Sequence, residues 1–427
     1  MTTYTIQPAS RLEGIIQLPG DKSISHRYAL LSAIAHGRSR LLNYSTGADC
    51  QSTLNCLAAL GVSVSRDTEG AVCIEGRGPE LAAPATMLDA GNSGSTIRML
   101  SGILAGQSFL SSIGGDDSLS RRPMDRILRP LTLMGARIEA REDRFPPLRI
   151  QGGSLQPIDY TLPVASAQVK SCILLAGLYA DGATVVREPV QTRDHTEIAL
   201  REFGADIHRS PGVIQLHGRP KLQARELYVP GDLSSAAFFL VAALLVPGSE
   251  LIIRRVGLNP TRTALLDFLV GAGASIRVLD LQQTAGELIG DLQVRGGPIR
   301  GGLIEGALTA ALIDEIPVLA ILGARSQEGL TVRDAAELRI KETDRIATLA
   351  ENLRRMGISI EVSADGFTIP GQQSFRGATV DSFGDHRIAM AFAIAGLCAV
   401  GPTHIRNPHA ASVSFPEFYS TLASLMN

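Results

Sequence analysis

Residues 19–27 read PGDKSISHR and place two cations and a hydroxyl where a helix is expected to begin. Lys22, the Ser23 hydroxyl and the free backbone N–H groups of the first turn can all bind an anion. Arg27 lies four residues beyond Ser23, about one helical turn, and can face the same ligand. The stretch predicts a phosphate or carboxylate site, although an ordinary helix start with exposed basic residues would read the same way.

Two later stretches have a similar composition. Residues 89–98 read DAGNSGSTIR, and there Gly94 lets backbone donors approach a ligand closely. Residues 114–123 read GGDDSLSRRP and bring Arg122 to the start of another expected helix, where a guanidinium suits a carboxylate or phosphate. A capped turn in the first case and a solvated loop in the second are the alternatives.

A fourth stretch, residues 163–171, reads PVASAQVKS and opens a helix rich in small residues. Ser166 and Gln168 offer neutral hydrogen bonds, which suit sugar-like hydroxyl groups. N-capping of the helix would by itself explain Ser166.

Three stretches in the C-terminal part of the chain also contain charged residues that could act on a ligand. Asp314 stands at the start of a largely apolar helix, where it could transfer a proton or simply stabilise the helix dipole. In the run ELRIKETDR (337–345), Lys341 and Arg345 are four residues apart and are expected to share a helical face, although a solvated charged face is the alternative. Arg387 precedes another small-residue helix and is a further candidate anion ligand.

The charge balance and the motifs exclude several classes of function. Lys and Arg number 40 against 42 Asp and Glu, and aromatic residues make up 4% with no Trp, so nucleic acid is not expected as a partner. No cluster has metal-ligand spacing, and neither G-x-G-x-x-G nor G-x-x-x-x-G-K-[ST] occurs. We therefore expect no metal and no cofactor.

The sequence also predicts the compartment. None of the five cysteines forms a C-x-x-C pair, which indicates free thiols in a reducing environment. The N-terminus has no signal-peptide pattern, and the longest apolar run, 236–246, is too short to span a bilayer. We expect a cytoplasmic protein without membrane contact.

One pattern recurs six times along the 427 residues. A small-residue helix ends near a glycine, a short strand follows, and then come a charged helix, a second glycine and another strand. The first glycines of the six copies are Gly37, Gly106, Gly182, Gly248, Gly329 and Gly401. Such long repeats are supersecondary units that bury their apolar faces against each other. We predict an α/β protein of two similar three-repeat domains, joined near residues 230–236, with the functional site in a cleft between them.

The complete set of motifs resembles one family. The residues that carry the resemblance are 19–27 (PGDKSISHR), 91–94 (GNSG), 122–124 (RPM), 166–171 (SAQVKS), 314–315 (DE), 341–345 (KETDR) and 385–387 (DHR). Together they resemble EPSP synthase (3-phosphoshikimate 1-carboxyvinyltransferase), in particular its divergent second class. The likeness implies a two-domain inside-out α/β barrel in which each domain contains three βαβαββ-type units. It implies residues 20–235 as the domain that binds shikimate 3-phosphate, and residues 1–19 plus 236–427 as the domain with the acid and base.

The resemblance also implies substrates and residue roles. Phosphoenolpyruvate would give its enolpyruvyl group to the 5-hydroxyl of shikimate 3-phosphate, with release of phosphate and without a cofactor, in a protein expected to be a monomer. The implied shikimate 3-phosphate ligands are Lys22, Ser23, Arg27, Ser166, Gln168, Asp314 and Lys341. The implied phosphoenolpyruvate ligands are Lys22, Gly94, Arg122, Gln168, Arg345 and Arg387. Asp314 would be the proton acceptor, Glu342 the acid for the methylene carbon, and Lys22 a third catalytic group.

The chain departs from the family pattern at two positions. Val413 stands where many members have Lys, so one phosphate contact must come from elsewhere, and Ala167 stands where many have Ser. Three alternatives remain. A UDP-N-acetylglucosamine enolpyruvyl transferase would need a reactive Cys in the loop 114–123, which has none; a silent phosphometabolite-binding protein would not need Asp314; and an RNA 3′-end cyclase would consume ATP and conflicts with the charge balance.

Overall fold

The computed structural model describes residues 2–426, which form two compact units. The inserted unit consists of Gly20–Pro230 together with Gln283–Glu287, and the terminal unit contains the residues up to Pro19, Gly231–Gln282 and those from Leu288 on. Each unit has its own hydrophobic core. No helix among residues 2–426 has the length and apolar character needed to cross a membrane.

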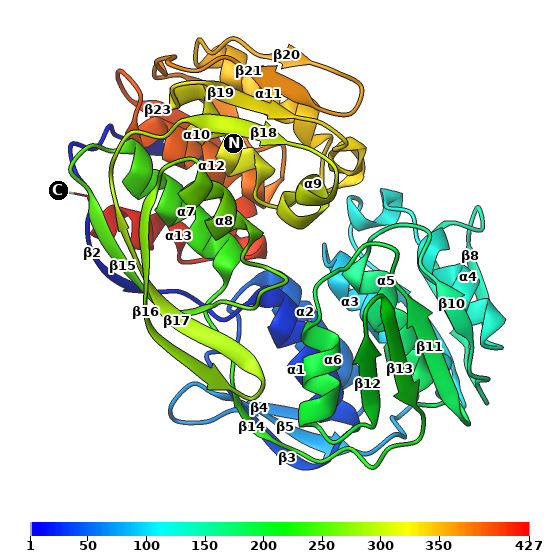
Figure 1. Ribbon diagram of the computed structural model, residues 1–427. Coiled ribbons are helices and arrows are strands. Elements are labelled where there is room, and N and C mark those ends of the chain that lie inside the picture. The colour runs from blue at the N-terminus through cyan, green and yellow to red at the C-terminus, as the bar shows by residue number, and fades with distance from the viewer. Residues whose placement is uncertain (1, 427) are drawn as a thin grey trace. The chain divides into compact units, whose positions relative to one another are not determined.

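Three four-stranded sheets belong to the inserted unit (Figure 1). In each sheet one parallel pair is followed by two antiparallel pairs. Their orders are β14-β3-β5-β4, β6-β7-β9-β8 and β10-β11-β13-β12. The strands are β3 (His36–Leu42), β4 (Ser63–Arg66), β5 (Val72–Arg77), β6 (Leu88–Asp89), β7 (Leu110–Gly114), β8 (Arg137–Arg141), β9 (Phe145–Gln151), β10 (Asp159–Thr161), β11 (Ala183–Arg187), β12 (Ile207–Ser210), β13 (Val213–His217) and β14 (Glu226–Tyr228).

The terminal unit has two four-stranded sheets of the same pattern, β16-β17-β15-β2 and β18-β19-β21-β20, and the three-stranded sheet β1-β23-β22. The strands are β1 (Thr3–Ile6), β2 (Glu13–Gln17), β15 (Glu250–Gly257), β16 (Ser275–Thr284), β17 (Glu287–Arg295), β18 (Gly301–Ile304), β19 (Gly329–Val332), β20 (Glu361–Val362), β21 (Phe367–Ile369), β22 (Thr379–Asp381) and β23 (Thr403–Arg406).

Three strands join sheets far from their place in the sequence. β14 pairs in parallel with β3, near the beginning of the inserted unit, and β2 pairs in parallel with β15 in the terminal unit. β1 likewise pairs with β23 near the C-terminus. The N-terminal segment therefore completes two sheets of the terminal unit, which explains why it belongs there.

The helices are of two kinds. One helix in each repeat is almost entirely buried: α1 (Lys22–Ile34), α3 (Gly94–Ala105), α5 (Ala167–Gly177), α7 (Leu233–Leu245), α10 (Ile316–Arg325) and α12 (His386–Leu397). The other helices are α2 (Ala48–Ala59), α4 (Asp125–Leu133), α6 (His195–Glu202), α8 (Ala264–Gly271), α9 (Ala307–Leu312), α11 (Arg345–Arg355) and α13 (Phe418–Ser424), with 3₁₀ turns at Leu119–Arg121, Ala336–Ile340 and Pro408–Val413.

The chain order of elements in β6-α3-β7-α4-β8-β9 and β10-α5-β11-α6-β12-β13 is the βαβαββ unit that the family resemblance implies. Small residues let the buried helices approach each other closely. A Cβ atom on Gly102 of α3, for example, would lie 2.3 Å from the carbonyl oxygen of Cys172 in α5. The predicted mixed α/β fold of repeated units is confirmed.

One expected element is wrong. Lys341 and Arg345 do not share a helical face, because Lys341 follows the 3₁₀ turn Ala336–Ile340 in an extended conformation and α11 begins only at Arg345. Asp344 caps α11 by accepting a hydrogen bond from the Ala347 N–H. The capping residue lies three residues after Lys341 and the helix begins one residue later, which the charge spacing alone does not reveal.

Replacing Gly102 by Val tests the close approach of α3 and α5. The valine side chain would collide with the backbone of α5, so we expect the free energy of unfolding to fall by about 1–3 kcal/mol. Urea denaturation followed by circular dichroism measures it. Gly153→Ala is the matched control, because a Cβ there meets no atom within 4 Å, and equal effects of the two changes would contradict the packing.

Candidate active site

The buried helices of the inserted unit begin at side-chain caps. Asp21 caps α1 by accepting from the Ile24 N–H at 2.9 Å, and Ser93 caps α3 by accepting from the Thr96 N–H at 3.0 Å. Ser166 caps α5, which is the alternative that the sequence left open for this residue. The caps leave other first-turn N–H groups available to an anion.

Lys22, at the start of α1, has an acidic partner. Its ammonium nitrogen lies 2.8 Å from Oδ2 of Asp49, in the first turn of α2. The Lys22 side chain remains 18% exposed, whereas that of Asp49 is 6% exposed. Sequence reasoning missed Asp49; its only signal is an acid just after Gly47, at the start of a helix.

Arg27 is held by three acceptors inside the inserted unit. Nε donates to Thr196 Oγ1 at 2.6 Å, Nη2 to Ser171 Oγ at 2.8 Å, and Nη1 to the Ser23 carbonyl oxygen at 2.8 Å. Burial lowers the pKa of Arg27 to about 10, although the carboxylate of Glu197 opposes that shift. The guanidinium is therefore still charged at neutral pH and fixed in orientation.

Gln168, on α5, is joined to α3 by both ends of its amide. Its Oε1 accepts from Nη1 of Arg98 at 2.8 Å, and its Nε2 donates to Ser95 Oγ at 2.9 Å. Gly94 lies beside the same arginine, since a Cβ atom on it would be 2.7 Å from Arg98 Nη1 and 3.5 Å from Arg122 Nη1. Two predicted ligands, Gly94 and Gln168, thus lie beside Arg98, and a third, Arg122, lies close to Gly94.

Arg122 is oriented by the loops around it. Nη2 donates to Asn92 Oδ1 at 2.7 Å and to Ser118 Oγ at 3.1 Å. Asn92 is itself fixed by donating to Asp116 Oδ2 at 2.7 Å. We call Lys22, Ser23, Arg27, Gly94, Arg98, Arg122, Ser166 and Gln168 the inserted-unit cluster.

The terminal unit contains a second charged cluster, centred on Asp314. Its carboxylate oxygens lie 4.0 Å from Lys341 Nζ, 3.8 Å from Arg345 Nη1 and 4.0 Å from Arg387 Nη2. Arg387 also donates through Nη1 to the Asp314 backbone oxygen at 2.6 Å. One carboxylate among three cations can accept a proton while the cations bind anions.

Arg345 is 1% exposed and has carboxylates on several sides. Nε donates to Asp385 Oδ2 at 2.8 Å, and Nη2 forms an ion pair with Glu342. Burial by itself lowers the pKa of Arg345, but Asp385 and Glu342 outweigh burial and the net shift of the pKa is upward. Burial lowers the pKa of Lys341 against the opposing charge of Asp314. We call Asp314, Lys341, Glu342, Arg345 and Arg387 the terminal-unit cluster.

Glu315, next to Asp314, has a structural role. Its carboxylate accepts from Ser234 and lies 3.3 Å from Nη2 of Arg262, and all three side chains are buried. These contacts link the start of α10 to that of α7. The arginine is 53 residues away in sequence, so nothing local predicts the pair.

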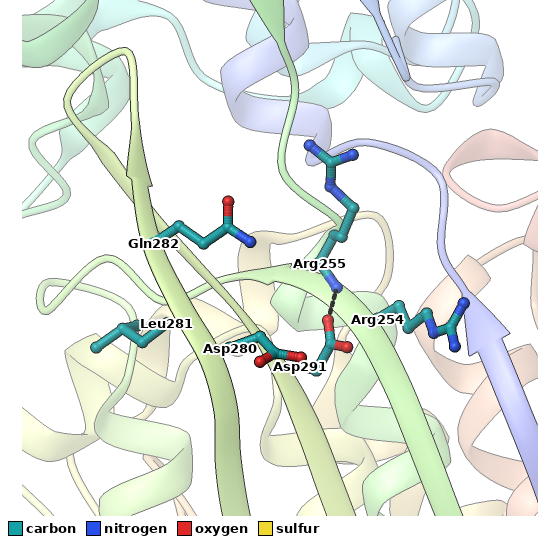
Figure 2. A pocket seen from close by; sticks show the side chains of 6 residues that line it. All are labelled: Arg254, Arg255, Asp280, Leu281, Gln282 and Asp291. Carbon is teal, nitrogen blue, oxygen red and sulfur yellow. Dashed lines mark hydrogen bonds between the residues drawn. The ribbon is translucent and has the colours of Figure 1, made fainter.

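The terminal unit also has a pocket of about 510 Å³ that is lined by residues outside both clusters (Figure 2). Its lining residues are Arg254, Arg255, Asp280, Leu281, Gln282 and Asp291. The backbone N–H of Arg255 donates to Asp291 Oδ1 at 2.7 Å, at a bulge in β15. All but one of these residues are exposed and none belongs to a predicted motif, so the pocket is not the candidate active site.

Comparison with solved structures defines the class of the fold. An EPSP synthase from Acinetobacter baumannii superposes with a TM-score of 0.88 at 42% sequence identity, covering 99% of this chain and 98% of that one. The enolpyruvyl transferase NikO from Streptomyces tendae gives a TM-score of 0.78 at 19% identity, covering 99% and 96%, and so supports the fold alone. The architecture is the inside-out α/β fold of these transferases.

Sequence comparison defines the family. The model of EPSP synthase (3-phosphoshikimate 1-carboxyvinyltransferase) matches residues 6–422. A 3-phosphoshikimate 1-carboxyvinyltransferase from Solibacter usitatus is 64% identical over 98% of both chains, and one from Koribacter versatilis is 51% identical over 99% of both. The chain belongs to the EPSP synthase family, and its activity is that of a 3-phosphoshikimate 1-carboxyvinyltransferase in the shikimate pathway. The predicted family and enzyme class are confirmed.

The buried His26 gives a pH-dependent prediction. Burial lowers the pKa of His26 well below 6.5, and the charges of Lys22 and Arg27 add to that shift. The unfolded chain takes up a proton near pH 6.5 and the folded one does not. The contribution to the free energy of unfolding is therefore full above pH 6.5 and falls by up to about 1.4 kcal/mol per pH unit below it.

His26→Asn should remove this part of the pH dependence. Urea unfolding at pH 7.5, 6.0 and 5.0 measures it as the difference between wild type and variant, which should shrink as the pH falls. His208→Asn, at a ring that is 72% exposed, is the control. A wild-type minus variant difference that is constant across this pH range would show that His26 is not held neutral.

Proposed function

We propose that the two clusters bind shikimate 3-phosphate and phosphoenolpyruvate and transfer the enolpyruvyl group to the 5-hydroxyl. The observation that carries the proposal is the carboxylate of Asp314 within 4.0 Å of Lys341, Arg345 and Arg387. Two phosphates and a carboxylate need several fixed cations, and the proton transfers need a base among them.

We assign the ligands by matching the motifs to the family. The shikimate 3-phosphate ligands are Lys22, Ser23, Arg27, Ser166, Gln168, Asp314 and Lys341. The phosphoenolpyruvate ligands are Lys22, Gly94, Arg122, Gln168, Arg345 and Arg387. The inserted unit would bind mainly the phosphorylated sugar-like ring, and the terminal unit would supply acid and base. Both clusters then act on the same substrate pair.

The proposed reaction is an addition followed by an elimination. In the addition, the methylene carbon of phosphoenolpyruvate gains a proton from Glu342, the 5-hydroxyl oxygen bonds to the neighbouring carbon, and Asp314 takes the hydroxyl proton. In the elimination, the new methyl group returns a proton to Glu342, the carbon–oxygen bond to phosphate breaks, and Asp314 passes the former hydroxyl proton to the leaving phosphate. Lys22, Arg345 and Arg387 would stabilise the negative charge on the leaving phosphate. No net proton remains on the side chains that exchange them.

We also propose that the protein works in the cytoplasm. All five cysteines lie within the described residues and are free thiols, as expected of a reducing compartment. Gel filtration with light scattering would test the proposed monomer. The direct test of the function is release of inorganic phosphate by the purified protein, which should require both substrates; no release with both present would refute it.

Asp314→Ala tests the proposed base. Without the carboxylate, the hydroxyl proton has no acceptor, and we expect kcat to fall by about 10²–10⁴-fold. Calorimetry should still detect binding of shikimate 3-phosphate, because its phosphate contacts remain. Asp267→Ala, at an exposed position of α8 in the same unit, is the control and should keep wild-type turnover. Unchanged turnover of Asp314→Ala would end the assigned role.

Gly94→Ala tests the phosphoenolpyruvate contacts. The added Cβ would push Nη1 of Arg98 away and crowd Arg122, so we expect the KM for phosphoenolpyruvate to rise about tenfold, with a smaller change for shikimate 3-phosphate. Steady-state kinetics with each substrate varied in turn measure both constants. Gly271→Ala, where a Cβ has open space, should change neither. Equal rises for both substrates would argue against the assignment.

A further inference from the structure

A chain of buried side chains connects three helices of the inserted unit. His26 Nδ1 on α1 lies 2.7 Å from Thr53 Oγ1 on α2, which lies 2.7 Å from Thr96 Oγ1 on α3. Thr96 Oγ1 donates to Ser93 Oγ at 2.8 Å and lies 3.4 Å from the Asp49 carbonyl oxygen. Each of the four side-chain residues is 0% exposed.

The spacing of these residues links the chain to the candidate active site. Lys22 and His26 are four residues apart on α1, and Asp49 and Thr53 are four residues apart on α2, so each pair occupies one helix face. The ion pair Lys22–Asp49 joins the first turns of the two helices, and the contact His26–Thr53 joins them one turn further in. The ion pair and the hydrogen bond, one helical turn apart, therefore hold α1 against α2.

Thr96 extends this arrangement to α3. Its hydroxyl meets Thr53 on one side and Ser93 on the other, and its backbone N–H donates to the same Ser93 oxygen. Ser93 directly precedes Gly94, at the helix start that faces Arg98 and Arg122. A shift of α3 relative to α2 would move Gly94 relative to Lys22.

We propose that Thr96 is a positioning residue of this enzyme: with Thr53 and His26 it holds the starts of α1, α2 and α3 in the arrangement that binds the two substrate anions. The proposal rests on the assignment of Lys22 and Gly94 to substrate binding made above. Thr96 touches no reacting atom in this account and acts through the two helix starts.

The hydrogen bonds that Thr96 makes explain why a hydroxyl is needed at position 96. A hydroxyl can donate one hydrogen bond and accept others, so Thr96 can serve Thr53 and Ser93 at once. Valine has the same shape but would leave two buried hydroxyls without this partner, and unpaired buried polar groups weaken the contact between the helices. Serine keeps the hydroxyl and loses only a methyl group.

Thr96→Val and Thr96→Ser separate the role of the hydroxyl from that of the volume. We expect Thr96→Val to lose about 10–100-fold in kcat/KM for phosphoenolpyruvate, through a higher KM and a lower kcat. Thr96→Ser should recover most of this loss, although it removes more volume. Thr53→Val should resemble Thr96→Val, and the double variant should lose little more than either single one.

Thr184→Val is the matched control. Thr184 is also a fully buried threonine of the inserted unit, but it lies on β11 and takes no part in the hydrogen bonds of Thr53 and Thr96. It should keep wild-type kinetic constants even if the variant is less stable by urea unfolding. Wild-type constants in Thr96→Val, or a Thr96→Ser variant as impaired as Thr96→Val, would overturn the inference. Failure of the proposed function is distinct, since the wild-type protein would then release no phosphate from the two substrates.

Discussion

Helices without a polar face impose the main constraint on this protein. α1, α3 and α5 in the inserted unit, and α7, α10 and α12 in the terminal unit, are buried on all sides and cannot lie on a surface. Each unit must therefore enclose them with its sheets and outer helices. The functional side chains of these helices therefore lie near their first turns, where polar groups emerge from the core, and the adjoining loops supply others.

The helix starts carry charges that need partners. A cation at a buried or half-buried helix start is repelled by the positive end of the helix dipole, and an acid nearby offsets this cost. Asp49 has this role for Lys22, and Asp385 and Glu342 have it for Arg345. The acids also hold the cations in fixed directions, which is what an enzyme that stabilises developing charge requires.

Much of the fold and the family can be predicted from the sequence. The contacts that cannot be predicted join residues far apart in the sequence. Local patterns predict the alternation of small-residue helix, glycine, strand and charged helix, and the apolar helix after Asp314, because each depends on neighbours within a few residues. They leave N-capping open as an alternative for Ser166, and the βαβαββ order follows from the family resemblance. The ordered motifs predicted the family. Asp49–Lys22 and Arg262–Glu315 could not be predicted, since each pair joins separate elements. The charge spacing predicts Lys341 on the same helix as Arg345, because it does not show that Asp344 caps α11 and that the helix begins only at Arg345.

A crystal structure of the protein with shikimate 3-phosphate and a stable phosphoenolpyruvate analogue would test the central claim most directly. The account predicts the sugar-like ring's phosphate against Lys22, Ser23 and Arg27, the analogue against Arg122, Arg345 and Arg387, and the 5-hydroxyl within hydrogen-bonding distance of the Asp314 carboxylate. Ligands bound away from these side chains, or a 5-hydroxyl out of reach of Asp314, would contradict it.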